Sequence, residues 1–256
     1  MKLRVLPYSP KSASAKKLAE AIDAKRIRLE GSDYEYTDGD LVINWGNGGH
    51  RGYPGMLNNP SAVCLSINKL SFFKTLASRG VGHLIPRFWT RGETIPADQF
   101  PVIARTKVEG ARGEGAVLAR SQDDMPGDPP LTTKLFPKTR EYRIHLGRTP
   151  GGQVSIIGKL TLLRYNGYDH SDIQNQANGY FHSANNADAV PLAVINTAEA
   201  VFLATGLDFC AMDVGYDSVT DTAVVFETNT APALEHKDVM EGYKAFFALY
   251  TKGIVS

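Results

Sequence analysis

The sequence predicts an α/β (α+β) protein, and its length fits one large domain or two to three small lobes. Three observations lead to this fold class. A strand, a helix and a second strand follow one another before residue 46, as in a parallel α/β unit. Short strands joined by glycine-rich turns dominate the middle of the chain, and helical segments accompany the strands of the last third. The chain has 256 residues, 43% of them hydrophobic, which is enough for a substantial core.

The first elements occupy the N-terminal part. Residues 2–8 (KLRVLPY) predict a strand, and residues 9–27 predict a helix capped by Ser9 or Ser12, because a serine hydroxyl accepts a hydrogen bond from a free backbone N–H group. Residues 40–46 (DLVINWG) predict the next strand, which runs into a loop with five glycines in residues 46–55. Ligand sites of open α/β sheets lie at the carboxyl ends of strands, so this loop is either part of such a site or a flexible connection.

A helix and a hairpin follow. Apolar residues at helical spacing predict a helix over residues 67–82, which closes at Gly80. Residues 102–108 and 115–120 predict two strands, and the sequence EGARGEG between them (109–115) predicts a glycine-tipped hairpin. Residues 121–130 are polar and rich in proline, which indicates a break.

The remaining elements are predicted as follows. Short strands span 131–136 and 141–146, and a longer strand spans 153–164. Residues 164–186 are rich in Asn, Gly and Asp, which predicts a long irregular loop of the kind that often carries function. The rest comprises a helix over 191–207, a hairpin of strands 211–217 and 223–229, and a closing helix over 241–252.

Charge and missing motifs exclude several classes of function. The chain has 28 basic and 27 acidic residues, a net charge of +1, which gives no reason to expect a nucleic acid or an anionic membrane as partner. The start lacks the apolar core of a signal peptide and no later run could span a bilayer, so we expect a cytoplasmic protein. The phosphate loop G-x-x-x-x-G-K-[ST], the G-x-S-x-G elbow and the H-E-x-x-H pair are all absent from the sequence.

Polar residues in the last predicted hairpin suggest a metal site. Glu227 and Asn229 are two residues apart on a strand and therefore face the same side, and Asp213 lies on the other arm of the hairpin. Burying two carboxylates is costly unless a cation compensates them, so these residues predict oxygen ligands for Mg²⁺. Two alternatives stay open: the residues are solvated on an open sheet face, or a carboxylate is paired with an arginine.

The same residues carry a family resemblance. Asp213, followed by Glu227-Thr-Asn229-Thr-Ala-Pro, resembles the metal-binding end of the ATP-grasp superfamily, and the resemblance covers most of the chain from about Asn68 onward. It implies an ATP-grasp fold, in which a small Rossmann-like N-terminal domain precedes two α+β lobes that sandwich ATP. The implied division is 1–66 for the N-terminal domain, 67–136 for the lid lobe and 137–256 for the C-terminal lobe with the metal site.

The resemblance also implies roles for individual residues. Asp213, Glu227 and Asn229 would hold Mg²⁺, with Mn²⁺ able to replace it. Arg143 and Lys159 would face the transferring phosphate. Because Ala211 stands where several of these ligases have an arginine, Arg143 or Arg164 would supply the transition-state cation. The implied ATP contacts are Lys69, Arg105 with Lys107 as its competitor, the flap glycines Gly110, Gly113 and Gly115, the hinge residues Lys134, Leu135 and Phe136, and Glu141 at the ribose.

The implied activity follows from the subfamily. The spacing of these motifs is similar to that of RimK-like carboxylate-amine ligases, including short versions found in bacteriophage genomes. Such enzymes activate a carboxylate with ATP as an acyl phosphate and join it to an amine, with release of ADP and phosphate. The partners would be small-molecule or peptide carboxylates and amines, and a homo-oligomer is compatible with the sequence.

The substrate site and the rival functions are less defined. The loops 46–55 and 164–186 would hold the two substrates, with Asn166, Asn178 and Tyr180 as candidate contacts. An ATP-grasp small-molecule kinase and a non-catalytic ATP-binding module are the alternatives. The potential metal ligands Asp213, Glu227 and Asn229 argue against the non-catalytic module, because a member of the family without catalytic activity would be free to lose its metal ligands.

Overall fold

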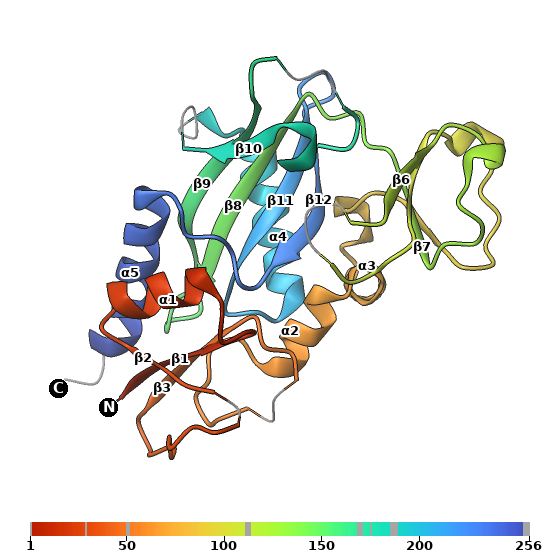
Figure 1. Cartoon of the computed structure of the whole chain (residues 1–256). Coiled ribbons are helices and arrows are strands. Elements are labelled where there is room, and N and C mark those ends of the chain that lie inside the picture. The colour runs from red at the N-terminus through yellow and green to blue at the C-terminus, as the bar shows by residue number, and fades with distance from the viewer. Residues whose placement is uncertain are drawn as a thin grey trace.

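The computed structural model describes residues 2–28, 30–49, 52–110, 114–167, 171–174, 176–184 and 189–252. Its strands form three sheets, which Figure 1 shows at different places in the molecule. We call them the first sheet (order β2-β1-β3), the small sheet (β4-β7-β5-β6) and the central sheet (β10-β9-β8-β11-β12). The mixed α/β class predicted from the sequence is confirmed.

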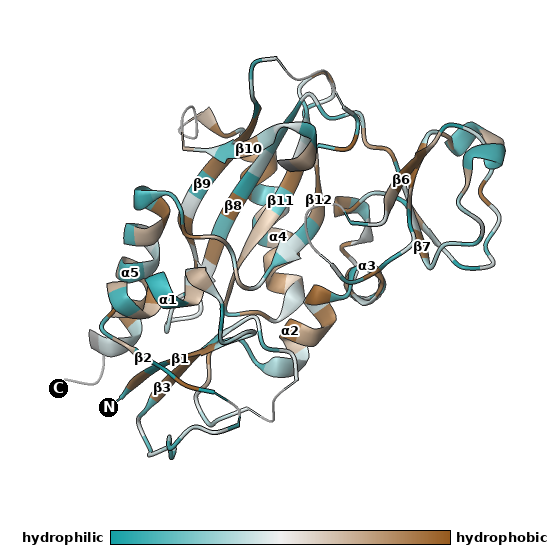
Figure 2. Cartoon of the chain, viewed as in Figure 1, coloured by the Kyte–Doolittle hydropathy of each residue, from teal (hydrophilic) through white to brown (hydrophobic). Residues whose placement is uncertain are grey.

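The first sheet is parallel, as the alternation of strand, helix and strand predicts. Helix α1 (Ala13–Ala21) connects its first two strands, and of the two candidate caps it is Ser12 whose side chain accepts a hydrogen bond, from the Ala15 amide. The stacked pair Trp45 and Phe209, with ring centroids 5.5 Å apart, joins this sheet to the central sheet. Figure 2 shows the hydrophobic character of β1. The strands are β1 (Leu3–Pro7), β2 (Lys25–Arg26) and β3 (Leu41–Trp45).

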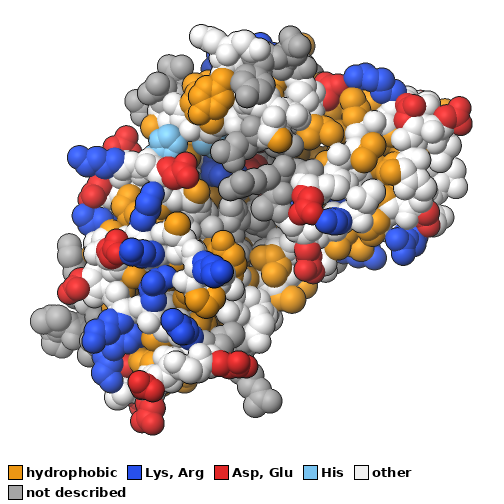
Figure 3. Space-filling view, viewed as in Figure 1, with side chains coloured by type: hydrophobic (Ala, Val, Ile, Leu, Met, Phe, Trp, Pro, Cys, Tyr) orange, Lys and Arg blue, Asp and Glu red, His pale blue; other side chains and the backbone are white. Residues whose placement is uncertain are grey.

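Strand β2 lies within the range 9–27 that the sequence predicts as one helix: α1 ends at Ala21, and Lys25 and Arg26 pair with β1 instead. It forms the edge of the first sheet and consists of the exposed Lys25 and Arg26. Basic side chains gather over α1 and the first sheet on the face that Figure 3 shows. Charged residues on an edge strand discourage pairing with another sheet.

The helix predicted over 67–82 is shorter than expected, and a second helix that the sequence did not predict precedes it. Helix α2 (Pro60–Ile67) ends and α3 (Lys69–Ser78) begins at Asn68, whose backbone is extended and whose side chain accepts a hydrogen bond from the Ser71 amide. An asparagine cap of this kind starts a new helix and changes its direction. Phe73 of α3 packs in the core that α4 shares with the central sheet.

The small sheet is antiparallel and contains the predicted hairpin. Its first arm, expected to reach residue 108, ends at Arg105, because the Thr106 amide donates to the Gly115 carbonyl (2.9 Å) and closes the loop. A Cβ on Gly115, whose φ is +75°, would lie 2.8 Å from the Thr106 hydroxyl, so this turn requires glycine. The strands are β4 (Phe88–Thr90), β5 (Val102–Arg105), β6 (Ala116–Ala119) and β7 (Leu131–Lys134), with short 3₁₀ turns η1 (Gly82–Leu84), η2 (Ala97–Gln99) and η3 (Gln122–Asp124).

The central sheet is antiparallel, with a crossover between the neighbouring strands β8 and β11, and one of its faces packs against helix α4 (Leu192–Thr205). Its edge corrects the prediction for residues 164–186: this stretch contains a turn, η4 (Gln176–Asn178), and a strand, β10 (Tyr180–Ser183), that pairs with β9. Helix α5 (Lys237–Lys252) contributes to the second large core with α1 and the first sheet. The other strands are β8 (Arg140–Arg148), β9 (Val154–Arg164), β11 (Phe209–Asp217) and β12 (Thr222–Asn229). Within the described ranges, none of the helices has the length and apolar character needed to cross a membrane.

Candidate active site

One face of the central sheet is polar. Asp213 on β11 lies opposite Arg143 of β8 on one side and opposite Glu227 of β12 on the other. The intervening residues Ile144 and Met212 point to the other face and belong to the core with α4. The two-residue alternation of strands therefore separates an apolar face from a charged one, and we call the charged one the polar face.

A β-bulge keeps Glu227 on the polar face. Val225 pairs with Val214 and Glu227 pairs with Asp213, so Phe226 is an extra residue in β12. Without it, residues 225 and 227 would share one face, whereas here Val225 is in the core and Glu227 is beside Asp213. The pairing of Asn229 with Ala211 continues the same face, as the sequence pattern predicts.

Asp213 and Arg143 form a bidentate ion pair. Arg143 Nε and Nη2 each donate to one oxygen of Asp213 at 2.7 Å, and Asp213 is 7% exposed. Burial by itself would raise the pKa of Asp213, but the charge and hydrogen bonds of Arg143 outweigh it and hold that pKa below its usual range. The reciprocal effect of Asp213 raises the pKa of Arg143 against the effect of burial. One alternative left open by the sequence, a carboxylate paired with an arginine, thus describes Asp213 in this structure.

Glu227 pairs with a lysine from another part of the chain. Lys69 Nζ, at the start of α3, lies 3.0 Å from Glu227 Oε2 and 3.3 Å from the Gly110 carbonyl oxygen. The adjacent Asn68 donates to Glu109 (3.0 Å). The structure therefore brings together three predicted site residues, Lys69, Gly110 and Glu227, whereas Gly113 lies outside the described residues.

Arg105 and Lys107, the two candidates for one predicted role, have different surroundings. The Nε atom of Arg105 is buried and has no hydrogen-bond partner within the described ranges. Burial lowers the pKa of Arg105, while the charge of Glu227 acts in the opposite direction. Lys107 is 58% exposed and pairs with Glu114 of the flap. A buried Nε donor that has no partner among the described residues, beside a carboxylate, suits an anionic ligand that enters next to Glu227.

Lys138 is a residue that the sequence analysis missed. It forms an ion pair with Glu141, and its ammonium lies 5.0 Å from the ring centroid of Phe226. Phe226 in turn contacts the predicted hinge residue Phe136, with centroids 6.2 Å apart. Burial raises the pKa of Glu141 in spite of the opposing charge of Lys138. The sequence gives no local signal for this pair, because Lys138 precedes β8 in an irregular segment and a spacing of three residues indicates contact only on a helix.

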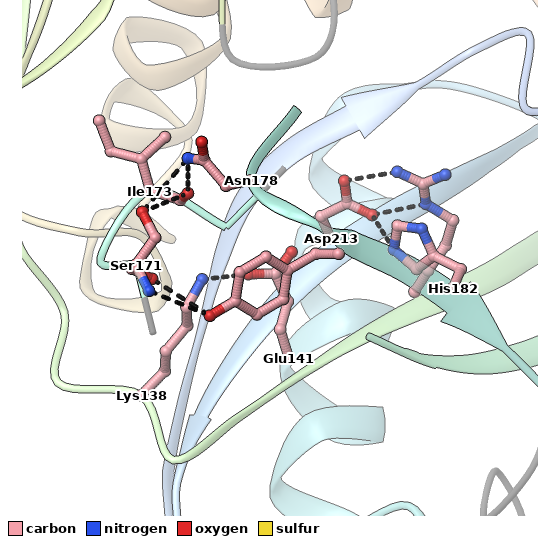
Figure 4. A network of polar contacts seen from close by, with 9 residues as sticks. Lys138, Glu141, Ser171, Ile173, Asn178, His182 and Asp213 are labelled. Atoms are coloured by element: carbon pink, nitrogen blue, oxygen red, sulfur yellow. Dashed lines mark hydrogen bonds and ion pairs between the residues drawn. The ribbon is translucent and has the colours of Figure 1, made fainter. Parts of the chain in front are cut away.

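His182 completes the cluster. Its Nε2 atom lies 3.9 Å from Asp213 Oδ1, is buried and has no hydrogen-bond partner in the part of the chain described. Burial lowers the pKa of His182 to about 4, because it outweighs the effect of Asp213. The His182 carbonyl is fixed by His236 Nε2 at 2.9 Å. Figure 4 shows His182, Asp213, Glu141 and Lys138 in this arrangement. A histidine in a stretch predicted as loop gave no signal in the sequence.

The donor set fits a divalent cation. Potential ligand atoms of Glu141, His182 and Asp213 all lie within 4.8 Å of one another. Glu227 and Asn229 lie on neighbouring positions of the same face. Carboxylate and amide oxygens are the usual ligands of Mg²⁺ and Mn²⁺, and imidazole binds the transition metals.

The structure places two predicted site residues away from the polar face: Lys159 lies on the other face of the central sheet, and Lys134 belongs to the small sheet. Lys159 pairs with Ile144, whose side chain is in the core with α4, so Lys159 points to that side of the sheet. Lys134 donates to the carbonyl oxygens of Gln99 (2.6 Å) and Phe100 (3.3 Å). Its partner in the small sheet is the core residue Val102, on the face opposite to Arg105. A sequence shows that a lysine is in a strand, but the register decides its face.

The predicted substrate contacts hold a loop in place. Asn178 Nδ2 donates to the Ser171 hydroxyl (3.2 Å) and the Ile173 carbonyl (2.5 Å), and the Tyr180 hydroxyl accepts a hydrogen bond from the Ser171 amide (3.2 Å), as Figure 4 shows in part. Asn166 and Arg164 are exposed, and Arg164 ends β9 opposite Tyr180. These contacts position β10, and with it His182, against the polar face.

The glycine-rich loop after β3 reaches the end of β12. A Cβ on Gly46 would lie 2.7 Å from the Ala231 side chain, and its φ of +84° disfavours other residues. The first sheet therefore borders the segment that follows Asn229.

A hollow of about 600 Å³ lies elsewhere, against the face of the small sheet that carries Trp89 and Thr132. None of the predicted site residues that the structure describes lines this hollow.

Comparisons with known proteins identify the fold. No protein-family model and no curated protein matches the chain. The D-alanine–D-alanine ligase of Bacillus anthracis matches with a TM-score of 0.64 and 13% identity, over 98% of this chain and 96% of that chain. The N5-carboxyaminoimidazole synthetase of Staphylococcus aureus matches with 0.65 and 13%, over 98% and 77%. The ATP-grasp ligase PsnB matches with 0.64 and 12%, over 97% and 98%. The chain therefore has the ATP-grasp fold.

Proposed function

We propose that this chain is an ATP-dependent ligase that activates a carboxylate as an acyl phosphate and joins it to an amine, with release of ADP and phosphate. A fold alone does not determine function, so the argument depends on the polar face. One observation carries it: three acid–base pairs, Asp213–Arg143, Glu227–Lys69 and Glu141–Lys138, lie on the polar face, with the free donor of Arg105 nearby.

These pairs have the charges that ATP with a divalent cation requires. When the triphosphate and its metal enter, the carboxylates can bind the metal and the freed cations can bind the phosphates, so no charge is left uncompensated. Asp213, Glu227 and Asn229 would hold Mg²⁺ or Mn²⁺, which neutralises the charge that develops on the transferring phosphoryl group. Structures of two proteins with the same fold support this ligand choice: one D-alanine–D-alanine ligase contains ATP, and PsnB contains Mg and ADP.

The other predicted ATP contacts would surround this centre. Lys69 and Arg105 would bind phosphate oxygens, and the flap with Gly110 and Gly115 would cover them with backbone N–H groups. The hinge at Leu135 and Phe136 would hold the adenine beside the ring of Phe226. Glu141 would bind the ribose through one carboxylate oxygen, and the other oxygen, which pairs with Lys138 in this structure, becomes free when Lys138 moves to a phosphate.

The reaction then has two steps. A carboxylate oxygen of the acid substrate attacks the γ-phosphorus and forms an acyl phosphate, while the bond to the β-γ bridging oxygen breaks and ADP leaves. The amine nitrogen next attacks the acyl carbon and loses a proton, and phosphate leaves. Arg143, released from Asp213 when the metal binds, would stabilise the negative charge that develops in both steps. Closure of the flap over the acyl phosphate would exclude water, which otherwise hydrolyses it.

The division into an N-terminal domain (1–66), a lid lobe (67–136) and a C-terminal lobe (137–256) is part of the proposal. Each sheet falls within one of these ranges. Helix α3, however, packs against α4, so the first part of the lid range belongs to the core of the C-terminal lobe. The hinge of a moving lid would then lie after α3. The RimK-like and phage-type assignment rests on the motif spacing and is also a proposal.

The test is a trapping assay. The chain is incubated with ATP, Mg²⁺ and pools of amino acids and peptides, with hydroxylamine as a trap for acyl phosphates. We expect a hydroxamate, ADP and phosphate, and the mass of the hydroxamate identifies the acid. A phosphorylated product without hydroxamate would show that the chain is a kinase and not a ligase. ATP binding without turnover in any pool would favour the non-catalytic module.

A further inference from the structure

We propose that His182 is a metal ligand, and that together with Asp213 and Glu141 it forms a mixed nitrogen and oxygen site for a first-row transition dication such as Mn²⁺. The inference rests on the proposed function, because it adds a ligand to the same centre. The motif resemblance assigns only oxygen ligands, whereas the structure places an imidazole next to them.

The geometry is close to that of a ligand set. The three ligand atoms lie within 4.8 Å of one another. Around a cation with bonds of roughly 2.0–2.2 Å, neighbouring ligand atoms are about 3 Å apart and opposite ones about 4.3 Å apart. The ligands therefore need to approach by only 1 or 2 Å, roughly the change of a side-chain torsion.

His182 is prepared to bind a cation. Its Nε2 atom is buried next to Asp213 and has no hydrogen-bond partner within the described ranges, an arrangement that costs stability unless a ligand uses it. The hydrogen bond from His236 to the His182 carbonyl fixes the backbone at this point.

The charges around the cluster explain when the ion would enter. Lys138 and Arg143 compensate Glu141 and Asp213, so a dication alone would add two uncompensated charges to a buried site. A nucleotide polyphosphate provides negative charge that both cations can bind instead. Lys138 also retains the Phe226 ring as a neighbour when it leaves Glu141. The ion is therefore expected to bind together with the nucleotide.

The nitrogen ligand determines the choice of metal. Mg²⁺ binds oxygen ligands almost exclusively, whereas Mn²⁺ and later first-row ions accept imidazole as well. With His182 in place, Mn²⁺ should bind more tightly than Mg²⁺. When the imidazole is removed, this preference should disappear.

The experiment uses the full chain labelled with ¹⁵N-histidine, with Mn²⁺ and ADP, and pulsed electron paramagnetic resonance. We expect hyperfine coupling of ¹⁵N to Mn²⁺ in the wild type and in the control His83→Gln, an exposed histidine on η1. The coupling should vanish in His182→Gln, and the Mn²⁺ dissociation constant should rise about tenfold or more, with Mg²⁺ affinity changed less than about twofold.

The outcomes separate this inference from the proposed function. Mn²⁺ bound to the wild type without histidine coupling overturns the role of His182 and leaves the ligase proposal intact, and this result does not depend on how the variant folds. Coupling that persists in His182→Gln overturns it as well. If ADP itself does not bind, as followed by fluorescence of a labelled nucleotide, both proposals fail.

Discussion

The two faces of the central sheet are built from the same strands and have opposite properties. On the face toward α4, Ile144 and Met212 are fully buried in a continuous hydrophobic core. On the polar face, one residue away on each strand, Arg143 and Asp213 are buried as charges. Apolar burial stabilises a protein directly, whereas a buried ion pair often contributes little net stability and is harmful when one partner is lost. We infer that the polar face is retained for binding and chemistry, and the following predictions test this contrast.

The largest effect is expected for Arg143→Met, which leaves the Asp213 charge buried without its partner. We expect a loss of about 3–5 kcal/mol in the free energy of unfolding at pH 7, measured by urea denaturation. The double variant Arg143→Met/Asp213→Leu, which removes both charges, should recover most of it. If the single variant is as stable as the wild type, Asp213 is not the buried charge that we describe.

The pH dependence of that loss gives a second check. The folded pKa of Asp213 lies below the value of about 3.9 for an unfolded aspartate, so its contribution to stability is present above that pH and is lost as the pH falls through the folded value. In Arg143→Met the buried carboxyl would protonate more readily. The stability difference between the two proteins should therefore shrink below about pH 4, and a constant difference from pH 7 to pH 3 would contradict the assignment.

Glu227→Gln should lower ATP turnover by about 10²–10³-fold, because it removes a negative charge from the proposed metal site with little change in volume. Stability should change little, since the side chain is 35% exposed. The matched control is Glu241→Gln, an exposed carboxylate on α5 that pairs with Lys244. Metal-dependent turnover at the wild-type rate in Glu227→Gln would show that Glu227 is not a ligand.

Arg105→Ala should raise the apparent KM for ATP about tenfold, because a buried guanidinium that binds phosphate contributes at the level of one charge-assisted hydrogen bond. Lys107→Ala is the control, since this exposed side chain pairs with Glu114 in the flap. Steady-state kinetics of both variants decides between them. A raised KM for ATP in Lys107→Ala with an unchanged KM in Arg105→Ala would show that Lys107, and not Arg105, binds the phosphate.

Ile144→Val is the test of the apolar face. Removing one methylene group from the core should cost about 0.5–1.5 kcal/mol in the free energy of unfolding, with an unchanged KM for ATP. Substitution of the neighbouring Arg143, on the other face, should by contrast change the KM for ATP. A large change in ATP binding in Ile144→Val would mean that the two faces are coupled rather than separate.

The smallest effect is expected for Lys159→Ala, because its side chain lies on the face toward α4 and away from the proposed ATP site. The catalytic rate should stay within about twofold of the wild type, as for most surface substitutions remote from a site. A loss comparable to that of Glu227→Gln would restore the role that the resemblance implied for Lys159 and would contradict the strand register.

The hairpin with Asp213, Glu227 and Asn229 shows how far sequence patterns reach. Alternation places the last two on one face, and the structure agrees. The position of Glu227 relative to Val225, however, depends on the bulge at Phe226, which no alternation predicts. Bulges arise where packing on both faces cannot be satisfied by a regular strand, so they become visible only when the neighbouring strand is known.

The sequence by itself determined the class of the fold, the order of its main elements and the polar residues of the last hairpin, because these depend on local periodicity and on turn and cap residues. The tertiary structure alone decided which cation meets which carboxylate. Lys69 and Glu227 are far apart in the chain, and His182 reaches Asp213 from an edge strand that the sequence presents as a loop. Side chains from distant segments meet only through sheet register and helix packing, and those are fixed by the burial of the whole core rather than by any short stretch of residues.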